Sequence, residues 1–287
     1  MKISHDIGPG RIALITGGSS GIGLALAKKL AQAGSHIWLV ARGLERLETA
    51  LAELEVIRVS PDQRFGLSAA DLSDPAQAEQ VVNQVIEAVG VPDVLINSAG
   101  IVEPGSFDDL SLDDFHEQMD VNYFAMIYVI KAALPGMCKR GTGTIVNIAS
   151  FAAVMGVYGY TAYAASKFAV RGFTEALRSE LKPQGIHVVL VYPPDTDTPQ
   201  LAYDNEKKPL ETKAISATAS KVMSAETVAA EIIKSIHRRR FAVIPGFDAK
   251  FFFTAVGISS AAIFLIVDRI IARTRRDQAL HSSDGEK

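Results

Sequence analysis

The sequence contains very little cysteine, because Cys138 is the only one among its 287 residues. A single thiol cannot form a disulfide within the chain, which fits a reducing compartment. The six histidines are scattered and no cysteine pair accompanies them, so we expect no metal site. The formal net charge is only −3, so the charge balance does not indicate a nucleic-acid partner. Residues 1–11 lack the apolar run of a secretory signal, which predicts that the main domain stays on the cytoplasmic side.

Short apolar runs alternate with segments of helical periodicity along most of the chain. The runs are continuous, as in Ile-Ala-Leu-Ile and Val-Val-Leu-Val, which is typical of strands buried on both faces of a parallel sheet. Strands are predicted at residues 11–15, 36–41, 65–69, 94–97, 144–149, 187–191 and 241–244. Helices are predicted at residues 22–33, 44–54, 75–89, 112–134, 162–181 and 225–237. The alternation predicts an α/β fold, a Rossmann-type doubly wound parallel sheet of about seven strands in the order 3-2-1-4-5-6-7.

A glycine-rich turn follows the first predicted strand and opens the first helix. It reads Thr-Gly-Gly-Ser-Ser-Gly-Ile-Gly over residues 16–23. Glycines let the backbone approach a pyrophosphate, and the helix N-terminus offers N–H donors and a favourable dipole. The alternative is that residues 16–23 form a tight turn with no ligand. The position of this segment directly after the first strand favours a nucleotide site. The residues expected to bind the cofactor here are Gly17, Ser19, Ser20, Gly21, Ile22 and Gly23.

The end of the second strand indicates which nucleotide binds. An Asp or Glu there would bind the ribose 2′-hydroxyl of NAD, but this chain has Ala41 followed by Arg42. A guanidinium can bind a 2′-phosphate through two donors. We therefore predict NADPH as the cofactor, with Arg42 as a solvated residue at a helix start as the alternative.

Two further strand ends carry candidate cofactor contacts. Asp71 and Leu72 follow the third strand, where Asp71 either accepts from the adenine amine or only caps a turn. The fourth strand ends in Asn-Ser-Ala-Gly, whose small residues would let the cofactor lie close to the backbone. Its candidate residues are Asn97, which could also cap a turn, Ala99 and Gly100.

The most informative spacing lies in Tyr-Ala-Ala-Ser-Lys, where Tyr163 and Lys167 are four residues apart. Residues at i and i+4 share one face of a helix, so the phenol and the ammonium can converge. A nearby cation favours the phenolate, so we expect the pKa of Tyr163 to lie below its reference value of about 10. Such a phenol can exchange a proton with a carbonyl or alcohol oxygen near neutral pH. Ser150 lies upstream at the end of a predicted strand, where a parallel sheet opens toward its ligands.

Together these motifs resemble the short-chain dehydrogenase/reductase family over about residues 8–245. The resemblance implies that Tyr163 is the acid/base and that Lys167 lowers its pKa and holds the nicotinamide ribose. It also implies that Ser150 binds the substrate oxygen and that Asn122 holds a water that relays protons. For Asn122 the alternative is a buried amide that bonds to local backbone. The loop after the sixth strand contacts the cofactor in relatives, which adds Pro193, Thr196 and Thr198 to the predicted cofactor-binding residues.

The segments around residues 151–171, 193–199 and 208–212 resemble the 3-ketodihydrosphingosine reductase subfamily. That resemblance implies reduction of a long-chain amino-ketone lipid to sphinganine. Asp195 and Asp197 could pair with the substrate ammonium or only cap turns in a Pro-rich loop. Two alternatives stay open. One is reduction of another lipid ketone, a 3-oxoacyl chain or a steroid. The other is a non-catalytic NADPH-binding regulator.

Residues 251–267 form a run of seventeen residues without a formal charge. As a helix this run would span about 26 Å at roughly 1.5 Å per residue, close to the hydrocarbon core of a bilayer. Basic residues flank both ends, so the segment could span a membrane or insert with both ends on one face. The alternative is a helix at the interface of a soluble oligomer. We expect a membrane-associated protein, at the endoplasmic reticulum in a eukaryote or the inner membrane in a bacterium.

These observations divide the chain into three parts. Residues 1–245 are the predicted NADP-binding catalytic domain, with a substrate loop or lid at about 193–220, since a connection that long is usually functional. Residues 246–276 are the predicted membrane-associating segment, and residues 277–287 are a polar tail expected to be disordered. Relatives of the family pair through helices equivalent to 112–134 and 162–181, which implies a homo-dimer or homo-tetramer.

Overall fold

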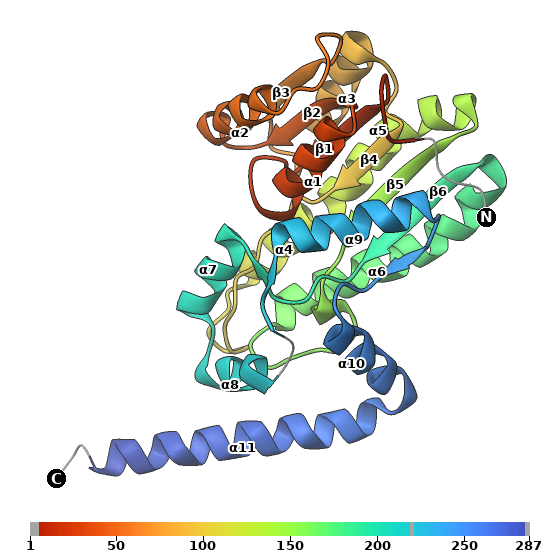
Figure 1. Ribbon diagram of the computed structural model, residues 1–287. Helices are drawn as coiled ribbons and strands as arrows, with labels where there is room; N and C mark the ends of the chain where they lie inside the picture. Colours follow the sequence, from red (N-terminus) through yellow and green to blue (C-terminus); the bar gives the residue numbers. More distant parts are fainter. Residues whose placement is uncertain (1–5, 219–220, 285–287) are drawn as a thin grey trace.

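The computed structural model describes residues 6–218 and 221–284 and is organised around one parallel sheet (Figure 1). Its strand order is β3-β2-β1-β4-β5-β6-β9, and every neighbouring pair is parallel. The predicted Rossmann-type topology is therefore confirmed, with β9 as the seventh strand. The strands are β1 (Ile12–Thr16), β2 (His36–Ala41), β3 (Phe65–Ala69), β4 (Val94–Asn97), β5 (Gly143–Ile148), β6 (Ile186–Val191) and β9 (Ala242–Val243).

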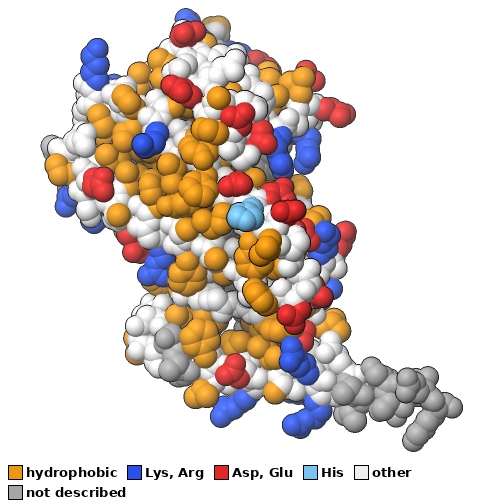
Figure 2. Space-filling model, turned by 180° about the vertical axis from the view of Figure 1, so that it is seen from behind, with side chains coloured by type: hydrophobic (Ala, Val, Ile, Leu, Met, Phe, Trp, Pro, Cys, Tyr) orange, Lys and Arg blue, Asp and Glu red, His pale blue; other side chains and the backbone are white. Residues whose placement is uncertain are grey.

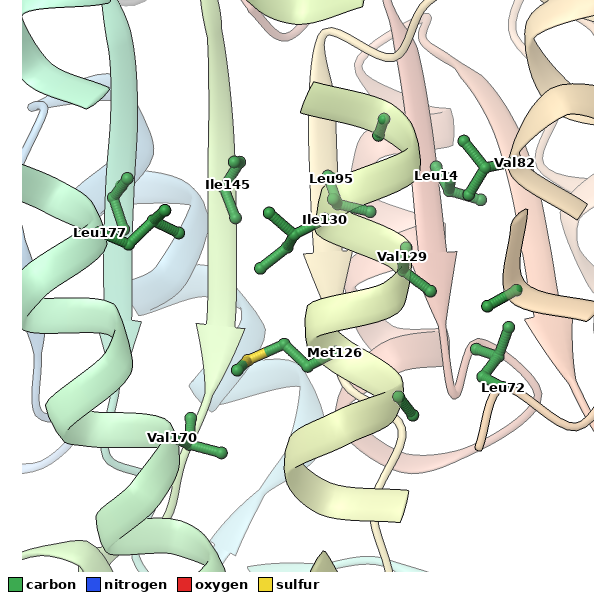
Figure 3. Packing of buried hydrophobic residues seen from close by; sticks show 14 of the residues in the cluster. Leu14, Leu72, Val82, Leu95, Met126, Val129, Ile130, Ile145, Val170 and Leu177 are labelled. Carbon is green, nitrogen blue, oxygen red and sulfur yellow. The ribbon is translucent and has the colours of Figure 1, made fainter. Parts of the chain in front are cut away.

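Helices cover both faces of the sheet. One face packs against α1 (Gly21–Gln32), α2 (Leu44–Val56) and α9 (Ala225–His237). The other packs against α3 (Pro75–Val89), α5 (Ala125–Arg140) and α6 (Thr161–Leu181). Successive side chains of a strand alternate between the faces, so both sets must be apolar, which explains the continuous apolar runs. Figure 3 shows one of these cores, where Leu14, Leu95 and Ile145 of the strands meet side chains of the covering helices.

The predicted helix at residues 112–134 is interrupted. A π-helical turn, Asp120–Phe124, separates α4 (Leu112–Met119) from α5, which continues to Arg140. The start of α4 follows its sequence signal, because Ser111 and Asp114 form a capping box. A π turn adds a residue to a helical turn and is frequent at functional sites. Here the π turn contains Asn122. The prediction of an unbroken helix over residues 112–134 is therefore wrong at the position of a predicted site residue.

The segment predicted as an irregular lid at residues 193–220 contains regular structure. It forms a short strand, β7 (Thr196–Asp197), which pairs with β8 (Met223–Ser224), and two helices, α7 (Pro199–Lys207) and α8 (Leu210–Thr218). Thr198 caps α7 by accepting from the backbone N–H of Leu201 at 3.2 Å, and proline occupies the first helical position. Residues 219 and 220 of the predicted lid lie outside the described residues.

Two helices follow the sheet, α10 (Phe247–Ile258) and α11 (Ser260–Asp284), which includes most of the predicted polar tail. Residues 285–287 of that tail lie outside the described part. The apolar stretches of α10 and α11 are bent by 110° and are together long and apolar enough to cross a membrane. The stretch Leu112–Arg140 passes the same test, but it covers the sheet as a core helix. Figure 1 shows α10 and α11 projecting as an elbow below the main body.

Candidate active site

A cavity of about 420 Å³ opens at the carboxyl edge of the sheet. The strand ends, the start of α1, the start of α6 and the α7–α8 segment all contribute to its wall. This is the expected ligand position in a doubly wound sheet. The predicted site residues that line it are Gly17, Ser19, Ser20, Gly21, Ile22, Arg42, Asp71, Leu72, Ala99, Gly100, Ser150, Tyr163, Lys167, Pro193, Thr196 and Thr198.

Three predicted site residues lie outside the cavity wall and support it from behind. A Cβ on Gly23 would come within 2.3 Å of the Gly17 carbonyl oxygen, so this glycine lets α1 pack against the turn. The Asn97 amide donates to the side-chain oxygen of Asn147 at 2.9 Å, across the neighbouring strands β4 and β5. Asn97 is therefore part of the buried floor. Asn122 is the third of these residues.

Asn122 joins the segment after β4 to α6. Its side-chain oxygen accepts from the Ile101 backbone N–H at 2.8 Å, and its amide donates to the Ile101 carbonyl oxygen at 3.0 Å. The same amide donates to the Ser166 hydroxyl at 2.9 Å. Asn122 is thus a buried amide, as the alternative expected, but its partners are distant in sequence and not the local backbone of its own helix. The water-relay role implied by the family resemblance stays a prediction.

The glycine-rich turn fits a phosphate group. Gly17 and Gly21 have φ values of 64° and 53°, which other residues rarely adopt. A Cβ on Gly17 would lie 2.7 Å from the Ala99 backbone nitrogen, so the turn and the end of β4 are in close contact. Ser20 forms no side-chain cap on α1, and the first turn of α1 carries no acidic residue. The N–H groups of α1 are therefore available to an anion without a competing carboxylate.

Two guanidiniums line the cavity near the end of β2. Arg42 follows β2 as predicted, and Arg46, one helical turn later, also lines the wall. Asp71 accepts from the Ser73 hydroxyl at 2.7 Å and from the Ser73 N–H at 3.0 Å, so it does cap a turn while it lines the cavity. These hydrogen bonds, together with the charge of Arg42, lower the pKa of Asp71. The sequence reasoning missed Arg46, although its spacing of i+4 from Arg42 was a usable signal.

Ser150, Tyr163 and Lys167 meet at the other end of the cavity. Lys167 is only 4% exposed, and its ammonium donates to the Ile148 carbonyl oxygen at 3.2 Å. The Lys167 Nζ atom lies 5.7 Å from the centre of the Tyr163 ring. Ser150 begins a short turn after β5 and accepts from the Ala152 N–H at 3.1 Å. The helical spacing therefore brings phenol and ammonium onto one face, as predicted.

The expected lowering of the Tyr163 pKa is wrong for this structure. Burial raises the pKa of Tyr163 to about 12, although hydrogen bonds with Ser150 and Gln200 lower it in part. Burial also lowers the pKa of Lys167 to about 8. Both shifts have the same cause, because removing water disfavours the charged form of each group. The sequence showed that a cation was near but did not show how strongly the fold desolvates the two groups.

Four polar residues that the cofactor and catalytic predictions did not include, Tyr160, Asp195, Gln200 and Asp204, also line the cavity. Tyr160 donates to Asp204 on α7, and its ring centre lies 5.7 Å from that of Tyr163. Asp197 is exposed and lies outside the cavity wall, which separates the two aspartates that the sequence left equivalent.

Residues 11–209 match the family model described as short chain dehydrogenase. The chain belongs to the short-chain dehydrogenase family. It is thus an oxidoreductase of a family that uses NAD or NADP cofactors. Within the described residues, no group of His, Cys, Asp and Glu side chains is arranged to hold a metal ion.

Similar proteins support the same assignment. The 3-ketodihydrosphingosine reductase of Bos taurus is 42% identical over 81% of this chain and 70% of its own length. The solved structure of a levodione reductase superimposes with a TM-score of 0.77 at 26% identity and covers 85% of this chain and 99% of its own. A family member from Burkholderia phymatum in complex with NAD has a TM-score of 0.73 at 25% identity, over 84% of this chain and 90% of its own.

The buried Lys167 predicts a measurable pH dependence of stability. Its folded pKa of about 8 lies below the ordinary value of 10.5, so the unfolded chain binds more protons between these values. The contribution of Lys167 to the free energy of unfolding therefore rises with pH across that window, by on the order of 2 kcal/mol. Urea unfolding of wild type and Lys167→Met at about pH 7.5 and about pH 10 measures it. Lys131→Met removes an exposed lysine and is the control. Equal pH dependence in wild type and Lys167→Met would contradict the expectation.

Proposed function

We propose that this protein reduces 3-ketodihydrosphingosine to dihydrosphingosine with NADPH. The observation that carries the proposal is the joint arrangement of Ser150, Tyr163 and Lys167 at one end of a cavity whose other end fits a dinucleotide phosphate. The similarity to a 3-ketodihydrosphingosine reductase over most of the chain supports the choice of substrate.

When bound, NADPH supplies the hydride that is added to the ketone carbon. Tyr163 donates its hydroxyl proton to the ketone oxygen as negative charge develops there. Its raised pKa keeps the phenol protonated and ready to donate. The Lys167 ammonium stabilises the phenolate that remains, and Ser150 donates a hydrogen bond to the same substrate oxygen. Asn122 acts as a positioning residue, because its hydrogen bonds hold α6 against the segment after β4.

NADPH is proposed over NADH because the nucleotide end is cationic. Arg42 and Arg46 both line it, and no acidic residue ends β2 where NAD would need one. Two guanidiniums can neutralise a 2′-phosphate that a ribose hydroxyl would not supply.

The C-terminal helices offer a route for a long alkyl chain. Phe252 packs against the cavity residue Phe151 at 5.3 Å between ring centres. An apolar cluster joins α10 and α11 to Val157 and Ile215, which also line the cavity. Arg275 of α11 ties this cluster to α8 through Glu211 at 3.1 Å. The cavity wall therefore adjoins apolar side chains of α10 and α11.

The same helices are proposed to attach the protein to a membrane surface. Their exposed apolar side chains include Phe251 at 71% and Ile258 at 81% exposure. Figure 2 shows hydrophobic side chains extending from the rear of the main body onto the lower end of the molecule. The 110° bend and the packing of α11 on α8 favour insertion into one leaflet. The catalytic domain is proposed to lie on the cytoplasmic side, as the sequence predicts. Exposed Phe124 and Phe168, on the helices through which relatives pair, are consistent with a homo-oligomer.

A reductase of a 3-oxoacyl chain or a steroid would use the same catalytic residues, so substrate comparison is the decisive experiment. A non-catalytic NADPH-binding regulator is disfavoured, because all four positions of the family's catalytic set are filled by the expected residues.

Tyr163→Phe is expected to reduce turnover of 3-ketodihydrosphingosine by at least about 100-fold, because the proton donor is lost. NADPH binding should stay within a few-fold, since the ring remains. The measurement is NADPH oxidation with detergent-dispersed substrate, and Tyr128→Phe, outside the cavity, is the control. More than a tenth of wild-type activity would exclude the acid/base role. Wild type that leaves this substrate unreduced but turns over a 3-oxoacyl chain or a steroid would refute the substrate.

Arg42→Ala is expected to raise the KM for NADPH by about 10- to 100-fold and to change the KM for NADH by less than about twofold. The reason is the loss of a bidentate partner for the 2′-phosphate. Steady-state kinetics with both cofactors measure the ratio, and Arg64→Ala, outside the cavity, is the control. If both cofactors are affected equally, Arg42 does not select the phosphate.

Wild-type protein is expected to co-sediment with vesicles of mixed zwitterionic and anionic lipid. The double variant Phe251→Asp with Ile258→Asp should weaken binding by more than tenfold. The reason is that each of these exposed side chains contributes about 1.5–3 kcal/mol when it is buried in the bilayer. Val56→Asp with Val59→Asp changes two exposed apolar residues of the main domain and should bind like wild type. Wild type that stays in the supernatant would refute membrane attachment.

A further inference from the structure

Ionisable side chains from three segments converge beside Tyr163. Tyr160 precedes α6, Asp195 lies in the loop after β6, and Asp204 and Lys208 belong to α7 and its end. The Tyr160 hydroxyl lies 2.9 and 2.8 Å from the two oxygens of Asp204. The Lys208 ammonium lies 3.3 Å from Asp204, and both side chains of this pair are less than a tenth exposed. Tyr160, Asp195 and Asp204 face the cavity.

The charges of this cluster do not balance. It holds two carboxylates and one ammonium, and Asp204 already receives both the ammonium and the phenol. Within the described residues 6–218 and 221–284, the Asp195 carboxylate makes no hydrogen bond or ion pair. The backbone carbonyl of Asp195 accepts from the Met223 N–H at 2.9 Å. Burial raises the pKa of Asp195, while Lys208 opposes that shift. A partly desolvated carboxylate of this kind is stabilised by one more cation.

The substrate in the proposed reaction carries such a cation. Its ammonium is bonded to the carbon next to the ketone, so it must sit close to the oxygen that Tyr163 protonates. The negative charges of Asp195 and Asp204 both act on the Tyr163 phenol, which places them in the same part of the cavity. At the opposite end, the cavity is lined by the cations Arg42 and Arg46, which would repel an ammonium.

We infer that Asp195 binds the ammonium group of an amino-ketone substrate and that the Tyr160–Asp204–Lys208 cluster holds α7 so that only Asp195 remains available to it. This inference rests on the proposed function and adds the residue that selects a 2-amino ketone over a ketone without the amine. Asp204 is a positioning residue here, because Lys208 neutralises it. Asp197 is excluded, since it is exposed and outside the cavity.

The test compares two substrates with the full-length protein and saturating NADPH. One is 3-ketodihydrosphingosine, and the other is the same ketone with hydrogen in place of the 2-amino group. Asp195→Asn is expected to lower kcat/KM for the amino ketone by at least about tenfold and to leave the amine-free ketone within about twofold. Asp197→Asn is the matched control and should behave like wild type with both substrates.

A second measurement does not depend on turnover. The affinity of dihydrosphingosine, the amine product, is measured by its inhibition of wild type and variants, and Asp195→Asn should weaken it by at least about tenfold. Equal losses for both ketones, or unchanged product affinity, would overturn the role of Asp195 while the proposed function stands. Wild type that reduces the amine-free ketone but not the amino ketone would overturn the proposed function and this inference together.

Discussion

The hydrogen bonds of one buried amide hold the chemical end of this site together. Asn122 contacts the Ile101 backbone on one side and Ser166 of α6 on the other. Because α6 carries Tyr163 and Lys167, their position relative to the end of β4 depends on this amide. The amide can reach both partners because it lies in a π turn between α4 and α5. An apolar residue at this place would leave buried backbone groups without partners, which is unfavourable by about 1–3 kcal/mol for each group.

The site concentrates polar groups where water is scarce. Lys167 and the Asp204–Lys208 pair are buried, and Tyr163 is half-buried. Desolvation shifts the pKa values of Tyr163 and Lys167 in the direction that favours the neutral form of each group. Such burial lowers stability, and the apolar cores on both faces of the sheet offset it. Desolvation also strengthens the electrostatic interactions of these groups, because the local dielectric constant is low. Under this condition a phenol, an ammonium and a carboxylate can discriminate between similar ketones.

The C-terminal helices connect this chemistry to the proposed lipid. Their apolar side chains meet Phe151, Val157 and Ile215 at the cavity wall and continue outward to exposed positions. A long alkyl chain could therefore lie along an apolar path while its polar head reaches Tyr163. The elbow between α10 and α11 suits attachment to one leaflet better than a straight span.

The sequence by itself determined the alternation of buried strands and helices, the glycine-rich turn and the placing of Tyr163 and Lys167 on one helix face. These features follow local rules: strands buried on both faces must be apolar throughout, glycines must occupy the tight turn, and residues four apart share a helix face. Only the tertiary structure decided the π turn at Asn122, the helices within residues 193–218, the second guanidinium of Arg46 and the direction of the Tyr163 pKa shift. Each of these depends on which distant segments pack together and how much water they exclude, and spacing along one chain does not encode that.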